Sequence, residues 1–189
     1  QFFRKCFGPF EFEGIRHTPP TRVFEGEMSV RVGDKTVDLI QVGPAHTRGD
    51  VLVHVPGDHT VFTGAILFID GTPNRWAGPV QNWIDACRRI AEMDVETVVP
   101  GHGPITDERG VEAVRGYLEY VRDETRKRYD AGMDAFEAAK DIALGDYASW
   151  GDAERIVVNV DRLYREFSGD DTAPEAAMLF GQMAELAQH

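Results

Sequence analysis

Cysteine, basic residues and long apolar runs are all scarce in this sequence of 189 residues. Its two cysteines, Cys6 and Cys87, are too few and too far apart for a disulfide framework or a cysteine-based zinc site. Lysine and arginine number 20 against 32 aspartates and glutamates, which gives a formal net charge of −12. A phosphate backbone or an anionic lipid surface would be repelled overall, so we expect neither nucleic acid nor membrane as a partner.

Other missing features limit the cellular locations and the enzyme classes that this sequence is compatible with. No apolar run approaches the roughly 20 residues that span a bilayer, and no segment resembles a signal peptide. Together with the few cysteines, this predicts a cytoplasmic protein. Nucleophile elbows, phosphate-binding loops and dinucleotide fingerprints are missing as well, which removes the commonest motif-based functions. The chain starts at Gln1 rather than at Met, which indicates a processed or partly observed chain.

The chain changes character near residue 105, within a length typical of one domain. We expect residues 1–105 to be β-rich with a helix near 79–93, and residues 106–189 to be a helical part of the same domain. Alternating apolar runs joined by short turns predict hairpins over 28–42 and 51–63. Helical periodicity and capping residues predict four helices in the later part, at about 106–130, 134–144, 152–167 and from 172 onward.

Two loops carry a histidine at the end of a strand-like run, with glycine and proline around it. The first loop is 43–50 with His46, and the second is 98–104 with His102. Glycine and proline let a backbone turn sharply and approach another group closely, which a histidine in the core does not need. For one such histidine alone, a hydrogen bond to nearby backbone is the usual role.

Together, the two loops resemble the third and last histidine motifs of the metallo-β-lactamase fold family. The resemblance extends to residues 61–68 between them, which are similar to the strand of that family that carries a metal-bridging acid after a glycine. Here Ala65 takes the place of the acid, and the opening His-x-His-x-Asp-His motif of the family is absent. The resemblance implies an α/β fold, the αββα sandwich of that family, of which this chain would form the C-terminal half plus a helical tail.

Carried over to this sequence, the resemblance implies metal ligands at His46 and His102, one for each of two adjacent zinc ions. Two histidines in matching loops favour ligation over a bond to backbone. The methyl group of Ala65 cannot coordinate a metal, and one imidazole per ion is far from the four ligands that hold zinc. We therefore expect weak zinc binding, or none, unless upstream ligands complete the site, with iron as the alternative metal.

The function that the resemblance implies is metal-dependent hydrolysis, in which a metal-activated water attacks an ester, thioester, lactone or amide bond of a small molecule. We expect the chain to be inactive on its own. Two alternatives stay open, namely a catalytically silent binding or scaffold protein, which Ala65 favours, and an iron-dependent oxidoreductase on the same fold. The sequence identifies no catalytic acid or base.

Two further residues are candidates for a substrate pocket. His17 lies ahead of the first hairpin in a segment without regular pattern, of the kind that forms lids. Trp76 lies on a turn-rich loop after the Ala65 strand, where we expect it to wall a pocket or, more commonly, to cover the core. Asp50 and Asp70 are expected to hold loops or face solvent rather than to replace the missing acid.

The later half of a two-sheet sandwich leaves one sheet face without its partner. On that face we expect apolar side chains such as Val37, Leu39, Val53 and Val55. An exposed patch of this kind is unusual on a soluble monomer. A missing N-terminal segment or a second copy of the chain is therefore expected to cover it.

Overall fold

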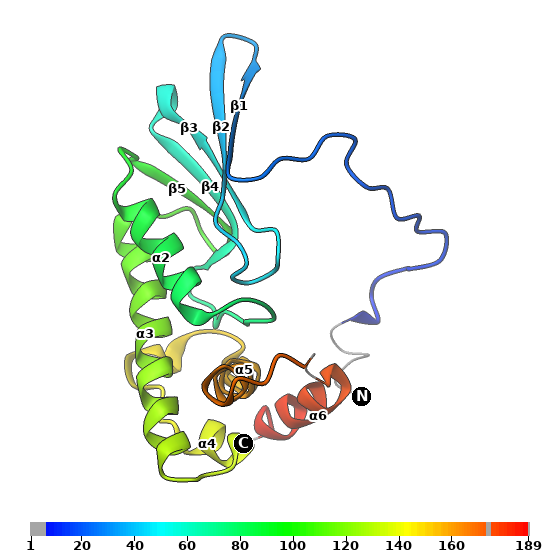
Figure 1. Ribbon diagram of the computed structural model, residues 1–189, viewed down its shortest axis with the longest axis vertical. Helices are drawn as coiled ribbons and strands as arrows, with labels where there is room; N and C mark the ends of the chain where they lie inside the picture. Colours follow the sequence, from blue (N-terminus) through cyan, green and yellow to red (C-terminus); the bar gives the residue numbers. More distant parts are fainter. Residues whose placement is uncertain (1–6, 173–174, 189) are drawn as a thin grey trace.

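The structure is a computed structural model that describes residues 7–172 and 175–188. Five strands form one sheet in the order β1-β2-β3-β4-β5, the order in which they follow along the chain (Figure 1). The first four strands pair antiparallel, and β5 pairs parallel to β4 after a crossover through helix α2. The strand bounds are Glu27–Val32, Lys35–Gln41, Val51–Val55, Thr60–Phe68 and Thr97–His102, and α2 spans Val80–Ala91.

Both predicted hairpins are present. A Gly33-Asp34 turn joins β1 to β2, and a 3-10 turn, η1 (Pro56–Asp58), lies between β3 and β4. Strand β4 continues past the predicted hairpin end at residue 63 to Phe68, as the resemblance of residues 61–68 implies, and its last three residues are buried. The structure therefore has the α/β architecture that the sequence predicts, with one sheet, helices on one face and a helical tail.

The second part of the chain is helical. Asp107 and Asp134 cap helices α3 and α4 by accepting hydrogen bonds from backbone N–H groups of the first turn. Helix α6 begins at Ala176, so the predicted start at Thr172 is wrong; the Thr172 hydroxyl instead accepts a hydrogen bond from Arg165. The bounds are Glu108–Asp130 for α3, Ala135–Asp141 for α4, Gly145–Ser149 for η2, Ala153–Arg155 for η3, Ile156–Ser168 for α5 and Ala176–Leu186 for α6.

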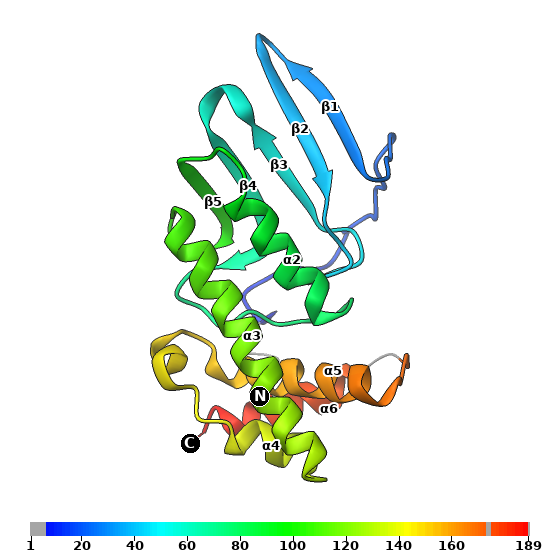
Figure 2. The same ribbon diagram turned by 60° about the vertical axis from the view of Figure 1, so that its left-hand side comes forward.

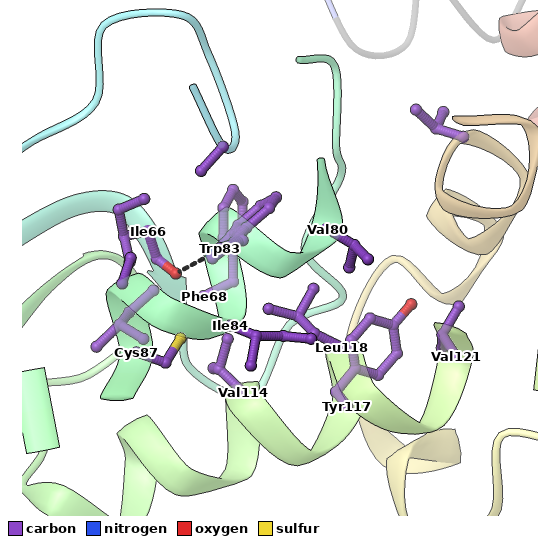
Figure 3. Close-up of a cluster of buried hydrophobic side chains, with 14 of the residues drawn as sticks. Ile66, Phe68, Val80, Trp83, Ile84, Cys87, Val114, Tyr117, Leu118 and Val121 are labelled. Carbon is purple, nitrogen blue, oxygen red and sulfur yellow. Dashed lines mark hydrogen bonds between the residues drawn. The ribbon is translucent and has the colours of Figure 1, made fainter. Parts of the chain in front are cut away.

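Helices α2 and α3 pack together on one face of the sheet and form the core (Figures 2 and 3). Trp83 of α2 is fully buried, and its indole Nε1 donates a 2.8 Å hydrogen bond to the Ile66 carbonyl of β4. Cys87 lies beside it in the same cluster, and burial raises the pKa of its thiol to about 12, so this thiol is structural. Cys6 lies outside the described residues.

The helical tail packs below the sheet, where α5 crosses α3 and contacts α4 (Figure 2). Buried apolar residues of α5 join the same continuous core, so the tail and the sheet share one hydrophobic cluster. No helix in the described part of the chain is long and apolar enough to cross a membrane.

The opposite face of the sheet carries a row of apolar side chains that no helix of the described residues covers. The pairing register aligns Met28, Leu39, Val53, Phe62 and Val99 across all five strands. None of them is buried, and Phe62 is 45% exposed, whereas residues that alternate with them, such as Leu52, Val61 and Val98, are fully buried under the helices. We call this row the open sheet face.

The predicted members of the open sheet face are placed as expected in three of four cases. Val37, Leu39 and Val53 lie half-buried on this side. The prediction for Val55 is wrong, because Val55 is buried at the end of its hairpin, where η1 folds against β2.

Candidate metal centre

The loop around His46 is held in shape by Asp50. The Asp50 carboxylate accepts hydrogen bonds from the backbone N–H groups of Ala45 at 3.1 Å and Thr47 at 2.9 Å, and from the Thr47 hydroxyl at 2.8 Å. This is the loop-holding role expected for Asp50. His46 therefore leaves the sheet on a backbone fixed from both sides.

The ring of His46 is oriented by a backbone carbonyl. Its Nδ1 lies 2.6 Å from the carbonyl oxygen of Asn74. Because a carbonyl can only accept, Nδ1 carries the proton, and the lone pair of Nε2 is left to bind a metal. Orientation of one ring nitrogen by a carbonyl is the usual arrangement around metal-binding histidines.

His102 meets His46 at the same end of the sheet. Its ring stacks on the ring of Phe68, with centroids 4.1 Å apart and planes 13° apart. The His46 ring lies 5.6 Å from the same Phe68 ring and 5.7 Å from that of Trp83. Phe68 thus brings the two histidines, which are far apart in sequence, to one place.

Two glycines allow the backbones around this place to approach closely. Gly78 has φ of +62°, and a Cβ added there would lie 2.0 Å from the Pro44 carbonyl oxygen. Gly103 has φ of +89°, and a Cβ added there would lie 2.1 Å from the Ile69 carbonyl oxygen. Both positions therefore require glycine, and for Gly103 the composition of its histidine loop indicates this.

A guanidinium group lies close to the histidine pair. Arg155 lies 5.8 Å from the centroid of the Phe68 ring and pairs with Asp152 at 2.8 Å. Burial, the charge of Arg155 and the charge of His46, in that order, lower the pKa of His102, while Asp152 opposes the shift. At neutral pH the His102 imidazole is consequently held in the neutral form, which is the form that binds metal.

Removing the Arg155 charge is expected to raise the pKa of His102. In an Arg155→Gln variant, the protonated imidazole no longer faces a neighbouring cation, so its titration midpoint moves up toward the ordinary value of about 6.5. NMR titration of the ring protons of the metal-free protein measures the shift. An Arg31→Gln variant, which loses the same charge on the distant β1 strand, serves as the control, and a midpoint unmoved by Arg155→Gln contradicts the electrostatic coupling.

The described residues supply only part of a zinc site. No group of three or more histidine, cysteine, aspartate or glutamate side chains lies close enough to hold a metal in the described part of the chain. Ala65 is half-buried against the core and offers a methyl group. The Asp70 carbonyl accepts from the Gly151 N–H at 2.9 Å, and its side chain lines a separate cavity. Two imidazoles fit zinc chemically, but the other ligands must come from elsewhere.

The loop that orients His46 is anchored by the helical tail. Asn159 of α5 accepts a hydrogen bond from the Arg75 N–H at 2.9 Å and donates one to the Pro73 carbonyl at 2.8 Å. The Arg75 guanidinium, which is 1% exposed, pairs with Glu166 of α5 at 2.7 Å. Burial lowers the pKa of Arg75 to about 10, so the group stays charged at neutral pH. Residues 73–75, and with them the Asn74 carbonyl, are fixed from both sides.

The two candidate pocket residues, His17 and Trp76, lie in different parts of the structure. His17 is exposed within residues 7–26, which arc away from the sheet and return to α6, so it does not join the histidine pair (Figure 1). Trp76 stays close, because its backbone N–H donates a 3.3 Å hydrogen bond to the His46 carbonyl. Its ring stacks on Phe180 of α6 and is partly buried against the core, and it also lines a cavity.

Comparison with known proteins identifies similar sequences and folds. A family model described as the metallo-beta-lactamase superfamily matches residues 7–102, about half of the chain. The 2,4-dinitroanisole O-demethylase subunit alpha of Nocardioides sp. (strain JS1661) is 29% identical over 90 residues, which are 44% of this chain and 26% of that protein.

Two solved structures share the fold at low identity, and their likeness shows the fold alone. A metallo-beta-lactamase family protein from Thermus thermophilus has a TM-score of 0.61 and 14% identity, covering 82% of this chain and 50% of that one. The sec-alkylsulfatase Pisa1 from Pseudomonas sp. has a TM-score of 0.58 and 10% identity, covering 83% of this chain and 28% of that one. The chain thus spans at most about half the length of these matched proteins.

Proposed function

Because the chain belongs to the metallo-β-lactamase superfamily, we propose that it contributes His46 and His102 as metal ligands to a metal-dependent hydrolase. The observation that carries the proposal is the arrangement around Phe68, whose ring both imidazoles contact. The hydrogen bond from His46 Nδ1 to the Asn74 carbonyl supports it further, because it leaves Nε2 for a metal.

The roles of the chain's own residues follow from this geometry. Zinc bound in such a site would supply a water that is acidic enough, near neutral pH, to attack an ester, thioester, lactone or amide. Asp50 holds the His46 loop, Asn74 fixes the ring tautomer, and burial together with the charge of Arg155 lowers the pKa of His102. Since the described residues give two of about four ligands, we propose that the 189-residue chain is inactive alone.

A catalytically silent binding protein is the second candidate function. It is favoured by Ala65, which stands where the resemblance places a bridging acid, and by the two-residue ligand set of the described chain. The O-demethylase name of one matched relative favours an enzyme instead.

Metal content and turnover of the full-length protein separate these functions. We expect elemental analysis to find zinc, and His46→Ala or His102→Ala to lower the zinc content and remove hydrolysis of a panel of esters, thioesters, lactones and amides. Protein that binds no metal and turns over no substrate would support the silent alternative. Bound iron with oxygen consumption would support an oxidoreductase and contradict the hydrolase proposal.

Restoring an acid at position 65 is expected to increase metal binding. In the full-length protein, Ala65→Asp adds an anionic ligand at the position that the resemblance assigns to a metal bridge. We expect about one additional tightly bound zinc per chain, measured by elemental analysis after dialysis. Ala131→Asp, at an exposed position after α3, adds the same charge away from the histidines and serves as the control. Equal zinc content in all three proteins contradicts the assignment of Ala65.

We also propose that a segment of the protein outside these 189 residues covers the open sheet face. Support comes from the apolar row that crosses all five strands and stays uncovered. The matched Thermus thermophilus protein has about as much chain again beyond the aligned half, which is enough for a second layer. A second copy of the chain is the competing occupant.

A further inference from the structure

A cavity of about 520 Å³ lies beside the His46 loop. Pro44 and Arg48, which flank His46 in sequence, form one wall, and the Trp76 side of loop 71–79 forms a second. Arg162 of α5, together with residues 171–172, closes it from the helical tail. Small-molecule sites in proteins span roughly 300–1,000 Å³, so the volume suits a small organic ligand.

The two arginines of this cavity differ from the other basic residues of the folded body. From β2 onward, every other arginine and lysine in the described part of the chain pairs with a carboxylate. Arg48 and Arg162 form no ion pair with a described residue. In a chain with a net charge of −12, acids are plentiful, so two unpaired guanidinium groups on one cavity are unexpected.

Of the two arginines, Arg162 is the one with a buried donor that lacks a hydrogen bond to any described residue. Its Nε is buried and makes no hydrogen bond within the described residues. The charge of Arg162 acts on the nearby Asp170. The Asp170 carboxylate, however, accepts its hydrogen bond from the Arg165 guanidinium, at 3.0 Å. A buried polar donor without a partner carries a desolvation cost, so the described residues leave this guanidinium group incompletely satisfied.

Trp76 adds an apolar wall beside the two charges. Its ring is held by stacking on Phe180, with centroids 6.1 Å apart, so it is a fixed surface for a flat or apolar group. A guanidinium binds carboxylate, sulfate or phosphate through paired N–H donors. The cavity therefore combines an anion site with an apolar platform.

From this combination we propose that the cavity binds the anionic group of an organic ligand, a carboxylate, sulfate or phosphate ester with an apolar body that rests on Trp76. Asp171 lines the same cavity and partly offsets the charge of the arginines. That this ligand is the substrate of the candidate metal centre rests on the proposed function, because the cavity adjoins the His46 loop. Binding of the anion itself does not require metal.

Calorimetric titration of the chain in EDTA tests the site without any turnover. The probes are naphthalene-2-sulfonate, 2-naphthoate and 2-naphthyl phosphate, with neutral 2-naphthylmethanol as the uncharged comparison and inorganic sulfate as the head group alone. We expect at least one naphthyl anion to bind at least tenfold more tightly than the alcohol and than sulfate. The binding should weaken as potassium chloride rises, because the charges are partly exposed.

Substitutions of cavity residues test whether the anions bind in this cavity. Arg48→Gln with Arg162→Gln is expected to weaken anion binding tenfold or more, Trp76→Leu to weaken naphthyl binding, and Asp171→Asn to strengthen it a few-fold. Arg31→Gln removes one charge outside the cavity and should leave affinity unchanged. Thermal unfolding of each variant shows that it is folded, and Asp171→Asn keeps both arginines in case their replacement destabilises the chain.

Two outcomes overturn the proposal, namely equal affinity for the neutral alcohol and the anions, or affinity unchanged in the double arginine variant. If the protein binds the anions but hydrolyses nothing, the anion site is supported and its role in hydrolysis is rejected. Hydrolysis without any preference for anionic substrates would keep the proposed function and reject the cavity as its substrate site.

Discussion

Replacing Glu166 by glutamine is expected to lower the free energy of unfolding by about 3–5 kcal/mol. The substitution keeps the size of the side chain but removes the counter-charge of Arg75, whose guanidinium is 1% exposed and 2.7 Å from Glu166. A buried charge without a partner carries its full desolvation cost. Chemical denaturation of the variant and the parent chain measures the difference.

A matched substitution separates this buried pair from ordinary surface pairs. Glu137→Gln removes the counter-charge of Lys140 in an exposed pair one turn apart on α4, where we expect a change of at most about 0.5 kcal/mol. Replacing both Arg75 and Glu166 by methionine should recover much of the loss, because no buried charge remains. Equal effects of Glu166→Gln and Glu137→Gln would contradict the structural role of Arg75.

The same variant probes the candidate metal centre from a distance. Arg75 follows Asn74, whose carbonyl accepts the hydrogen bond from His46 Nδ1. Loosening this segment should increase the exchange of the His46 ring proton seen by NMR, while the distant β1–β2 hairpin stays unchanged. Glu166 is thus a positioning residue for His46.

Local sequence patterns correctly predicted the elements that depend on interactions between residues close in sequence. The Gly33-Asp34 turn and the alternating runs on either side predicted the first hairpin correctly, because turn chemistry and side-chain alternation act within a few residues. The glycines of the second histidine loop were also informative, since Gly101 and Gly103 are required by close backbone contacts. The contact of both imidazole rings with Phe68 depends on how β4 and β5 pair, which no local pattern specifies.

The links between the tail and the site could not be predicted in this way. Asn159 bonds to residues 73 and 75, and Glu166 to Arg75, across 84–91 positions of sequence. One signal was present, because Asn159 is a polar residue inside the apolar run 156–160, where a buried amide needs a specific partner. Its partners lie on a loop without regular secondary structure. Such a loop has no hydrophobic periodicity, so the sequence could not identify them.

Charge placed on the open sheet face is expected to change the association state of the 189-residue chain. The face carries Leu39, Val53 and Phe62 in one row, and leaving several hundred Å² of such surface in water costs on the order of 10 kcal/mol. That cost is comparable to the whole stability of a domain, so we expect the chain alone to associate through this face. Light scattering and sedimentation velocity measure the association.

A double variant, Leu39→Lys with Phe62→Lys, should shift the chain toward monomer, because two like charges would face each other across any contact between copies. Met178→Lys, on an exposed apolar residue of α6 far from the sheet (Figure 1), is the control and should leave the association unchanged. Circular dichroism shows whether each variant keeps its helices. If the unsubstituted chain is a well-folded monomer that does not aggregate, the open sheet face needs no cover, and the proposal of a covering segment fails with it.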